Sequence, residues 1–190
     1  MIVCGAAAIA LAGCVSVLPE PEAPDALYRI EGQKTIQGLT ENVIIREPEA
    51  PRLSAGQAMV SEMSGRLRLI PRVEWAGAAT RQMQNAIIDS FSLQNDGNAL
   101  LPESGVSTAY EVFSHMKVFH VVDGEAVCDM TVATTFLISR NGASQVEHVS
   151  AKVPVRGDRA DDLAFALKEA GEQCAEEAAR FIADATDNNP

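Results

Sequence analysis

The sequence predicts an α+β fold: a mixed, largely antiparallel sheet whose three C-terminal strands form a meander packed against two amphipathic helices. Apolar residues alternate with polar ones between residues 110 and 155, which is the period of strands. Residues 76–93 and 159–185 instead repeat apolar residues every three or four positions, which is the period of helices. With 190 residues, 47% of them hydrophobic, the chain is long enough for one domain with a full core.

The chain begins with an uncharged apolar run that ends in Leu11-Ala12-Gly13-Cys14. The run is shorter than the ~20 residues that span a bilayer, so it is typical of a secretory signal. Its last four residues resemble the lipobox of bacterial lipoproteins, which implies cleavage between Gly13 and Cys14 and acylation of Cys14. The alternative is an ordinary secretory signal with a coincidental cysteine. We therefore expect a signal peptide at 1–13 and an acylated, proline-rich spacer at 14–26.

One domain is expected at 27–186, followed by a disordered tail at 187–190. Short strands are predicted at 27–30 and 42–46. Ser64-Gly65 is a turn signal followed by the alternating residues 66–69, which predicts a hairpin, although 57–63 fits a helix as well as a strand. Trp75 then leads into a helix over about 76–93, whose apolar stripe is Ala79, Met83, Ile87 and Phe91.

The meander is predicted from two turns. Asp123-Gly124-Glu125 as a three-residue loop merges the even-numbered apolar faces of the first two strands, because an odd loop pairs even residues with even residues. Asn141-Gly142 predicts a two-residue turn that pairs Arg140 with Ala143 and so places Cys128 opposite Val155. The buried face of the first strand is then expected to hold Tyr110, Val112, Met116, Val118 and Val122, and that of the second to hold Cys128, Met130, Val132, Phe136 and Ile138.

The terminal helix, expected from about Arg159 to Ala185, follows Asp158 as its cap. Its stripe should lie on the meander's buried face and bring Cys174 toward Cys128. In an export compartment this pair permits a disulfide; the alternative is two buried thiols that pack as small hydrophobic groups. The stripe consists of Leu163, Leu167, Ala170, Cys174, Ala178, Phe181 and Ala185.

Composition and motifs point away from catalysis. The formal charge of −11 argues against nucleic acid as a partner and against polybasic docking on anionic lipid. Five positions apart on one strand, His115 and His120 should face opposite sides, which excludes a joint metal site unless a bulge intervenes. No nucleophile elbow, phosphate loop or Cys-x-x-Cys motif occurs. We therefore expect no enzymatic activity, no metal and no cofactor.

One stretch is a candidate surface for an apolar partner or a lipid, because methionine-rich apolar patches adapt to varied apolar molecules. The alternative is that the same residues belong to the core, with the single tryptophan as an anchor. The candidate residues are Met59, Val60, Met63, Leu67, Leu69 and Trp75.

The order of these features resembles the ABC-type transport auxiliary lipoproteins, the PqiC-like lipoproteins. The resemblance is carried by the lipobox, Leu27-Tyr28-Arg29-Ile30 after a proline-rich spacer, Gly65-Arg66-Leu67, and Val73-Glu74-Trp75-Ala76 before a helix. It covers most of residues 11–185. Gly77-Ala78-Ala79 departs from the family, which more often has a proline and acids there.

The resemblance implies a non-enzymatic periplasmic lipoprotein, anchored in the outer membrane through acylated Cys14. It would be the auxiliary component of an ABC transport system that moves lipid between membranes, docking on the Mce-domain protein of that system. Contact with lipid and assembly into a homo-oligomer are further implications. The alternative function is a structural envelope lipoprotein that scaffolds an outer-membrane or secretion complex.

Overall fold

A computed structural model describes residues 23–37, 39–92, 97–137 and 144–187. The predicted signal peptide, Cys14, the Asn141-Gly142 turn and residues 188–190 lie outside these ranges.

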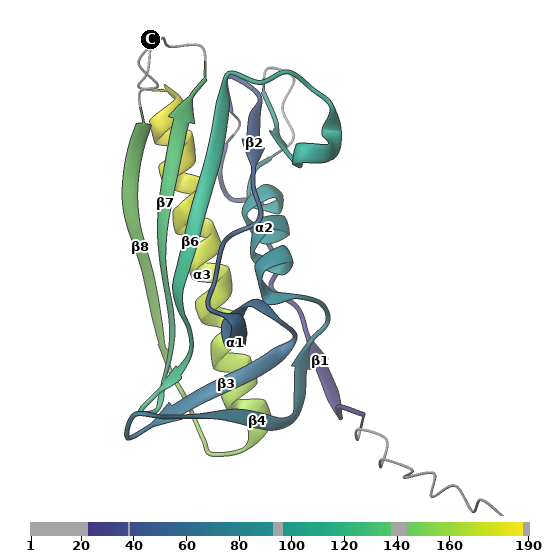
Figure 1. Ribbon diagram of the computed structural model, residues 1–190, viewed down its shortest axis with the longest axis vertical. Coiled ribbons are helices and arrows are strands. Elements are labelled where there is room, and N and C mark those ends of the chain that lie inside the picture. Colours follow the sequence, from purple (N-terminus) through teal and green to yellow (C-terminus); the bar gives the residue numbers. More distant parts are fainter. Residues whose placement is uncertain (1–22, 38, 93–96, 138–143, 188–190) are drawn as a thin grey trace, which may run out of the picture.

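Within the described residues, eight strands form one mixed sheet around the long strand β6 (Figure 1). One edge of β6 pairs antiparallel with β7, which pairs with β8. The other edge pairs in parallel with β2 at its start and with β3 at its end, and β4 and β1 continue the sheet beyond β3. The α+β class and the largely antiparallel mixed sheet are confirmed. The strands are β1 Ala26–Tyr28, β2 Val43–Ile45, β3 Ala58–Met63, β4 Arg66–Trp75, β5 Ala99–Leu100, β6 Tyr110–Val122, β7 Glu125–Phe136 and β8 Ser144–Pro154.

The helices are α1 Arg52–Ala55, α2 Ala79–Asp89 and α3 Ala160–Asp187, with a 3₁₀ turn at Pro102–Ser104. Helix α3 runs along the meander and packs on β7 and β8, while α2 packs beside α3 (Figure 1). The predicted α2 stripe is confirmed, because Ala79, Met83 and Ile87 are fully buried and Phe91 is buried just beyond the helix. In α3 the buried stripe is wider than predicted, with Ile182 buried and Phe181 only half-buried.

The β3–β4 hairpin turns at Ser64-Gly65, as predicted. Met63 pairs with Arg66, and the two turn residues have φ of 52° and 74°, the left-handed conformation that matches the twist of two-residue hairpins. Residues 57–63, which fit a helix or a strand by sequence, form β3. The hairpin lies at one end of the molecule, at the bottom of Figure 1.

The β6–β7 turn differs from the predicted three-residue loop. Val122 pairs with Glu125, so the turn consists of Asp123 and Gly124 alone. This even turn would put the two apolar faces on opposite sides of the sheet. A bulge at Lys117, between Met116 and Val118, restores the parity.

Two residues predicted to be buried therefore lie on the other face. Val118 and Val122 are half-exposed, whereas Phe119 and Val121 face the core. The physical reason is that a bulge adds one residue to a single strand and so reverses the alternation on one side of it.

The predicted register of β7 and β8 is wrong by four residues. Cys128 pairs with Ala151 rather than with Val155. Because four is an even number, the shift leaves the same β8 side chains on the buried face, and Val149, Ala151 and Val153 still meet the apolar face of β7.

Candidate functional site

A cleft of about 630 Å³ opens between α2 and the outer face of the meander. Its walls come from the segment after β2, from α2, from the 3₁₀ turn, and from β6 and β7. The lining residues are Arg46, Glu47, Glu49, Arg81, Gln84, Pro102, Glu103, Phe113, Ser114, His115, Thr131 and Ala133.

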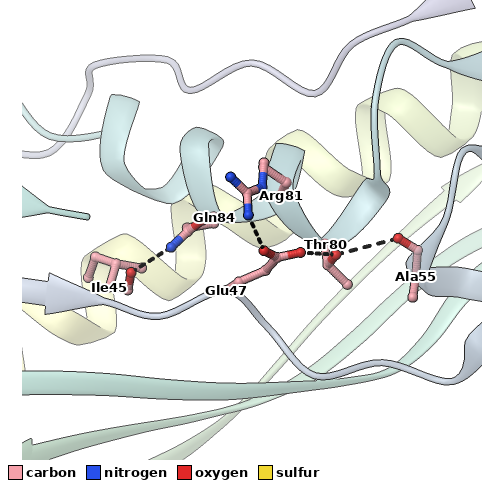
Figure 2. Close-up of polar contacts among 6 residues, drawn as sticks. All are labelled: Ile45, Glu47, Ala55, Thr80, Arg81 and Gln84. Carbon is pink, nitrogen blue, oxygen red and sulfur yellow. Dashed lines mark hydrogen bonds and ion pairs between the residues drawn. The ribbon is translucent and has the colours of Figure 1, made fainter. Parts of the chain in front are cut away.

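Glu47 holds one wall of this cleft together (Figure 2). Its carboxylate accepts hydrogen bonds from the Thr80 hydroxyl at 2.6 Å and from Arg81 at 2.9 Å, both on α2. One turn further along α2, the Gln84 amide donates to the Ile45 carbonyl at 2.8 Å. These bonds join the chain after β2 to α2, so this wall is positioned by two elements far apart in the sequence.

Phe113 and Arg46 present an aromatic ring and a cation to the same cleft. Phe113 is 46% exposed, and the Arg46 guanidinium carbon lies 5.3 Å from its ring centroid, a cation–π distance. Arg46 also donates to Glu111 at 2.5 Å. Nearby Ser114 is buried, and its hydroxyl has no hydrogen-bond partner among the described residues. The cleft thus offers an exposed Arg–Phe pair, which suits binding.

The three histidines lie on the outer face of the meander, but each is paired with a different carboxylate. Because of the bulge at Lys117, His115 and His120 share the outer face, so the expectation of opposite faces is wrong. Each nevertheless meets a different carboxylate: His115 is 4.0 Å from Glu49, and His120 is 3.1 Å from Glu62. His148 meets Asp129 at 2.9 Å. In the part of the chain that the structure describes, no three ligating side chains are grouped to hold a metal ion.

The candidate apolar surface divides into core and exposed residues. Met59, Val60 and Trp75 are at most 2% exposed, so these three belong to the core and cannot meet a partner. Met63, Leu67 and Leu69 are 67%, 49% and 62% exposed. The physical reason is that β3 and β4 extend beyond the core as they approach the Ser64-Gly65 turn. Only the start of β3 and the end of β4, which lie far from this turn, are covered by the rest of the protein.

Arginines accompany the exposed residues of this hairpin. Arg66 and Arg68 are exposed, and neither side chain forms an ion pair with any residue that the structure describes. Arg72, further along β4, pairs with Asp25 at 2.6 Å. We call Met63, Arg66, Leu67, Arg68 and Leu69 the hairpin tip.

Cys128 and Cys174 meet in the core, as the helix stripe predicts. Both are fully buried free thiols. Burial, followed by a hydrogen bond with Cys174, raises the pKa of the Cys128 thiol well above its ordinary value. The disulfide itself stays a prediction.

The sequence reasoning missed the cleft. Its residues come from segments with no shared motif, and Glu47 and Arg81 meet only in the folded chain. One signal was available: Phe113 occupies an outward position of β6, where a large aromatic side chain is unusual on a solvated face.

A family model identifies the family of this chain, and two solved structures share its fold. The model of the ABC-type transport auxiliary lipoprotein component family matches residues 27–179. No curated protein matches the chain. A crystal structure of a Xanthomonas campestris protein of the DUF330 family is 15% identical, with a TM-score of 0.65 over 87% of this chain and 94% of that one.

A second crystal structure, of an uncharacterized protein, is 13% identical, with a TM-score of 0.62 over 86% of this chain and 99% of that one. At such low identity the two structures show the fold alone. Among the described residues, no helix is both long and apolar enough to span a membrane. The family model covers most of the chain, and the chain therefore belongs to the ABC-type transport auxiliary lipoprotein component family.

Proposed function

We propose that this protein is a lipid-anchored, non-catalytic component of an ABC system that transports lipid between membranes, and that it docks on the Mce-domain protein of that system. The observation that carries the proposal is the family match over residues 27–179. Leu11-Ala12-Gly13-Cys14 supports acylation of Cys14, since two or more acyl chains hold a protein on a membrane without a spanning helix. We place the anchor in the outer membrane.

The cleft supports a docking role. Interface hot spots are enriched in aromatic residues and arginine, and Phe113 and Arg46 present such a pair at an open, concave surface. The nearby carboxylates of Glu47 and Glu111 are occupied by arginines, which leaves them poorly suited to general acid or base work. We therefore assign the docking of the Mce-domain protein to this cleft.

The anchor is tested by fractionation. We expect Cys14→Ala to release the protein from the membrane of its native host into the soluble periplasm, while Cys4→Ala, inside the predicted signal peptide, leaves it bound. When the membranes are then separated by density, we expect the wild-type protein in the outer-membrane fraction. Membrane association unchanged by Cys14→Ala would refute the acyl anchor.

Docking is tested with the purified periplasmic part of the Mce-domain protein encoded in the same genome. We expect Phe113→Ala to weaken binding by at least about 30-fold, as for a hot-spot residue. Phe165→Ala is the matched control, because Phe165 is 61% exposed on α3, outside the cleft. Equal binding of both variants would exclude the cleft.

A genome without an Mce-domain protein or an ABC pair near this gene would favour the scaffolding alternative over transport. Lipid analysis of the protein purified from native membrane separates the two functions further, because only the transport role predicts co-purified lipid.

A further inference from the structure

We propose that the hairpin tip contacts the surface of the membrane that carries the anchor, with its apolar side chains in the headgroup interface and Arg66 and Arg68 on lipid phosphates. The choice of membrane rests on the acyl anchor of the proposed function. The contact itself is carried by the exposure, charge and position of the β3–β4 hairpin.

The hairpin tip has apolar side chains on both of its faces. Antiparallel partners share a face, so Leu67 and Leu69 lie on the same side as their partners Glu62 and Val60. Met63 pairs with Arg66 on the opposite side. A protein partner packed on one face would leave the other exposed. A lipid interface surrounds an inserted tip and covers both faces at once.

The outer edge of β4 is also poorly suited to a further strand. Strand β1 pairs with β4 only from Val73 onward, so within the described residues the edge from Arg66 to Pro71 has no neighbour. Pro71 lacks an N–H, and Arg72 has a φ of 65°, at a point where the β3–β4 register shifts. Such features block edge-to-edge pairing, which disfavours strand addition from a second copy.

Charge on the hairpin is opposite to that of the whole chain. Residues 63–72 contain three arginines and no acidic residue, in a protein whose net charge is −11. Two carboxylates lie beside the turn: Glu62, which pairs with His120 at 3.1 Å, and Asp123, which accepts from the Ser64 N–H at 3.4 Å. The net charge describes the surface as a whole, and it argues against docking on anionic lipid only on average. The hairpin tip is a local region of positive charge within that acidic surface. Guanidinium groups bind phosphate through charge-assisted, often bidentate hydrogen bonds, so lipid headgroups complement Arg66 and Arg68.

The position of the anchor brings the hairpin tip within reach of the membrane. The Asp25 N–H donates to the Arg72 carbonyl at 2.7 Å, so the chain enters the domain beside β4. Eleven residues lead from Cys14 to Asp25, which can span at most about 40 Å. The tip lies about 20 Å along β4 from Arg72. Strands β1, β3 and β4 lie at the same end of the molecule (Figure 1).

Insertion is tested with the mature chain coupled through Cys14 to maleimide lipids in phosphatidylcholine–phosphatidylglycerol vesicles. Cys128 and Cys174 are buried, which leaves Cys14 as the reactive thiol. A tryptophan is introduced by Leu67→Trp, or by Leu69→Trp should the first variant not fold. We expect brominated lipid to quench this tryptophan, while Phe165→Trp on α3 is not quenched. Trp75 is buried and gives the same background in both.

The charge contribution is tested with the soluble Cys14→Ser chain. We expect the double variant Arg66→Gln/Arg68→Gln to bind vesicles with phosphatidylglycerol about 30-fold more weakly. The charge-matched control, Lys152→Gln/Arg180→Gln, alters exposed cations outside the hairpin and should bind like the unsubstituted chain.

Equal quenching at positions 67 and 165, or none at 67 and 69, would overturn the proposal. The proposal would also be overturned if light scattering shows an oligomer that Leu67→Ser dissociates, because the hairpin tip would then be an interface between copies. Since the maleimide replaces the acyl chains, this experiment does not depend on natural acylation, and the two proposals can fail separately.

Discussion

The indole ring of Trp75 and the phenyl ring of Phe119 stack with 5.3 Å between centroids and 12° between planes. Trp75 ends β4, and Phe119 lies on β6 just after the bulge at Lys117. The stack therefore ties the strand that carries the hairpin tip to the central strand of the sheet. It exists only because the bulge turns Phe119 inward.

Truncation of this tryptophan should destabilise the domain strongly. We expect Trp75→Ala to lower the free energy of unfolding by about 3–5 kcal/mol, because it removes a side chain that is 2% exposed and leaves a cavity against Phe119. Urea unfolding followed by circular dichroism measures the loss. Trp75→Phe keeps a ring on Phe119 and should cost less; equal losses would mean that the stack contributes nothing.

Deletion of Lys117 tests whether the bulge sets the parity of β6. Without the extra residue, the two-residue turn at 123–124 forces either Phe119 or Met116 out of the core. We expect a loss of more than about 4 kcal/mol, or no soluble folded protein. Lys117→Ala keeps the residue count and should change stability by less than about 0.5 kcal/mol, because the side chain is exposed. A deletion variant as stable as the wild type would contradict this.

Gly32 and Gly77 should respond differently to the same substitution. A Cβ at Gly32 would lie 2.5 Å from the Ala86 carbonyl oxygen, a backbone atom of α2 that cannot move aside cheaply. We expect Gly32→Ala to lower the free energy of unfolding by about 1–3 kcal/mol. A Cβ at Gly77 meets nothing within 4 Å, so Gly77→Ala serves as the control in the same thermal unfolding assay.

Tyr28 should ionise unusually late. Its hydroxyl donates to Asp161 at 2.8 Å, and burial followed by this bond raises its pKa to about 12 from 10.0. A raised pKa means that the protonated phenol is favoured in the folded state. Its contribution to stability is full below pH 10 and is lost as pH rises through 12. The difference in phenolate absorbance between the wild type and Tyr28→Phe, measured as a function of pH, gives the titration of Tyr28 alone. A Tyr28 transition near pH 10 would contradict the hydrogen bond to Asp161.

The cysteine pair predicts a disulfide in protein matured in an oxidising compartment. Cys128 and Cys174 contact each other in the core, which meets the first requirement for a bond. Non-reducing mass analysis should then give a chain lighter by two hydrogens, and reduction should lower the unfolding free energy by about 4 kcal/mol. In reduced protein the raised pKa keeps Cys128 protonated, so alkylation should require unfolding. Free thiols at both positions in native protein would refute the bond.

The elements themselves could be read from the sequence because their signals are local. The period of Ala79, Met83 and Ile87 predicts both a helix and its buried face, and Ser64-Gly65 predicts a hairpin because few residues adopt its left-handed backbone easily. Cys174 on the terminal stripe was correctly expected to approach Cys128, since both lie on faces that local alternation defines.

The pairings were harder to predict because the apolar pattern has a period of two. A β8 strand shifted by four residues buries the same kind of side chains, so the pattern alone cannot separate Ala151 from Val155 as the partner of Cys128. The bulge at Lys117 compensates for the two-residue turn at Asp123-Gly124. No residue type between Met116 and Val118 predicts a bulge at this position.

The sequence by itself determined the types of most elements and the buried faces of α2 and β7, because each depends on neighbours within a few residues. The acyl anchor at Cys14 stays a prediction from the same kind of local pattern. Only the tertiary structure decided that Met59, Val60 and Trp75 are core while the hairpin tip is exposed, and that Arg46, Glu47 and Arg81 meet around one cleft. Burial and side-chain contacts depend on which distant segments pack together, and no short stretch of the chain contains that information.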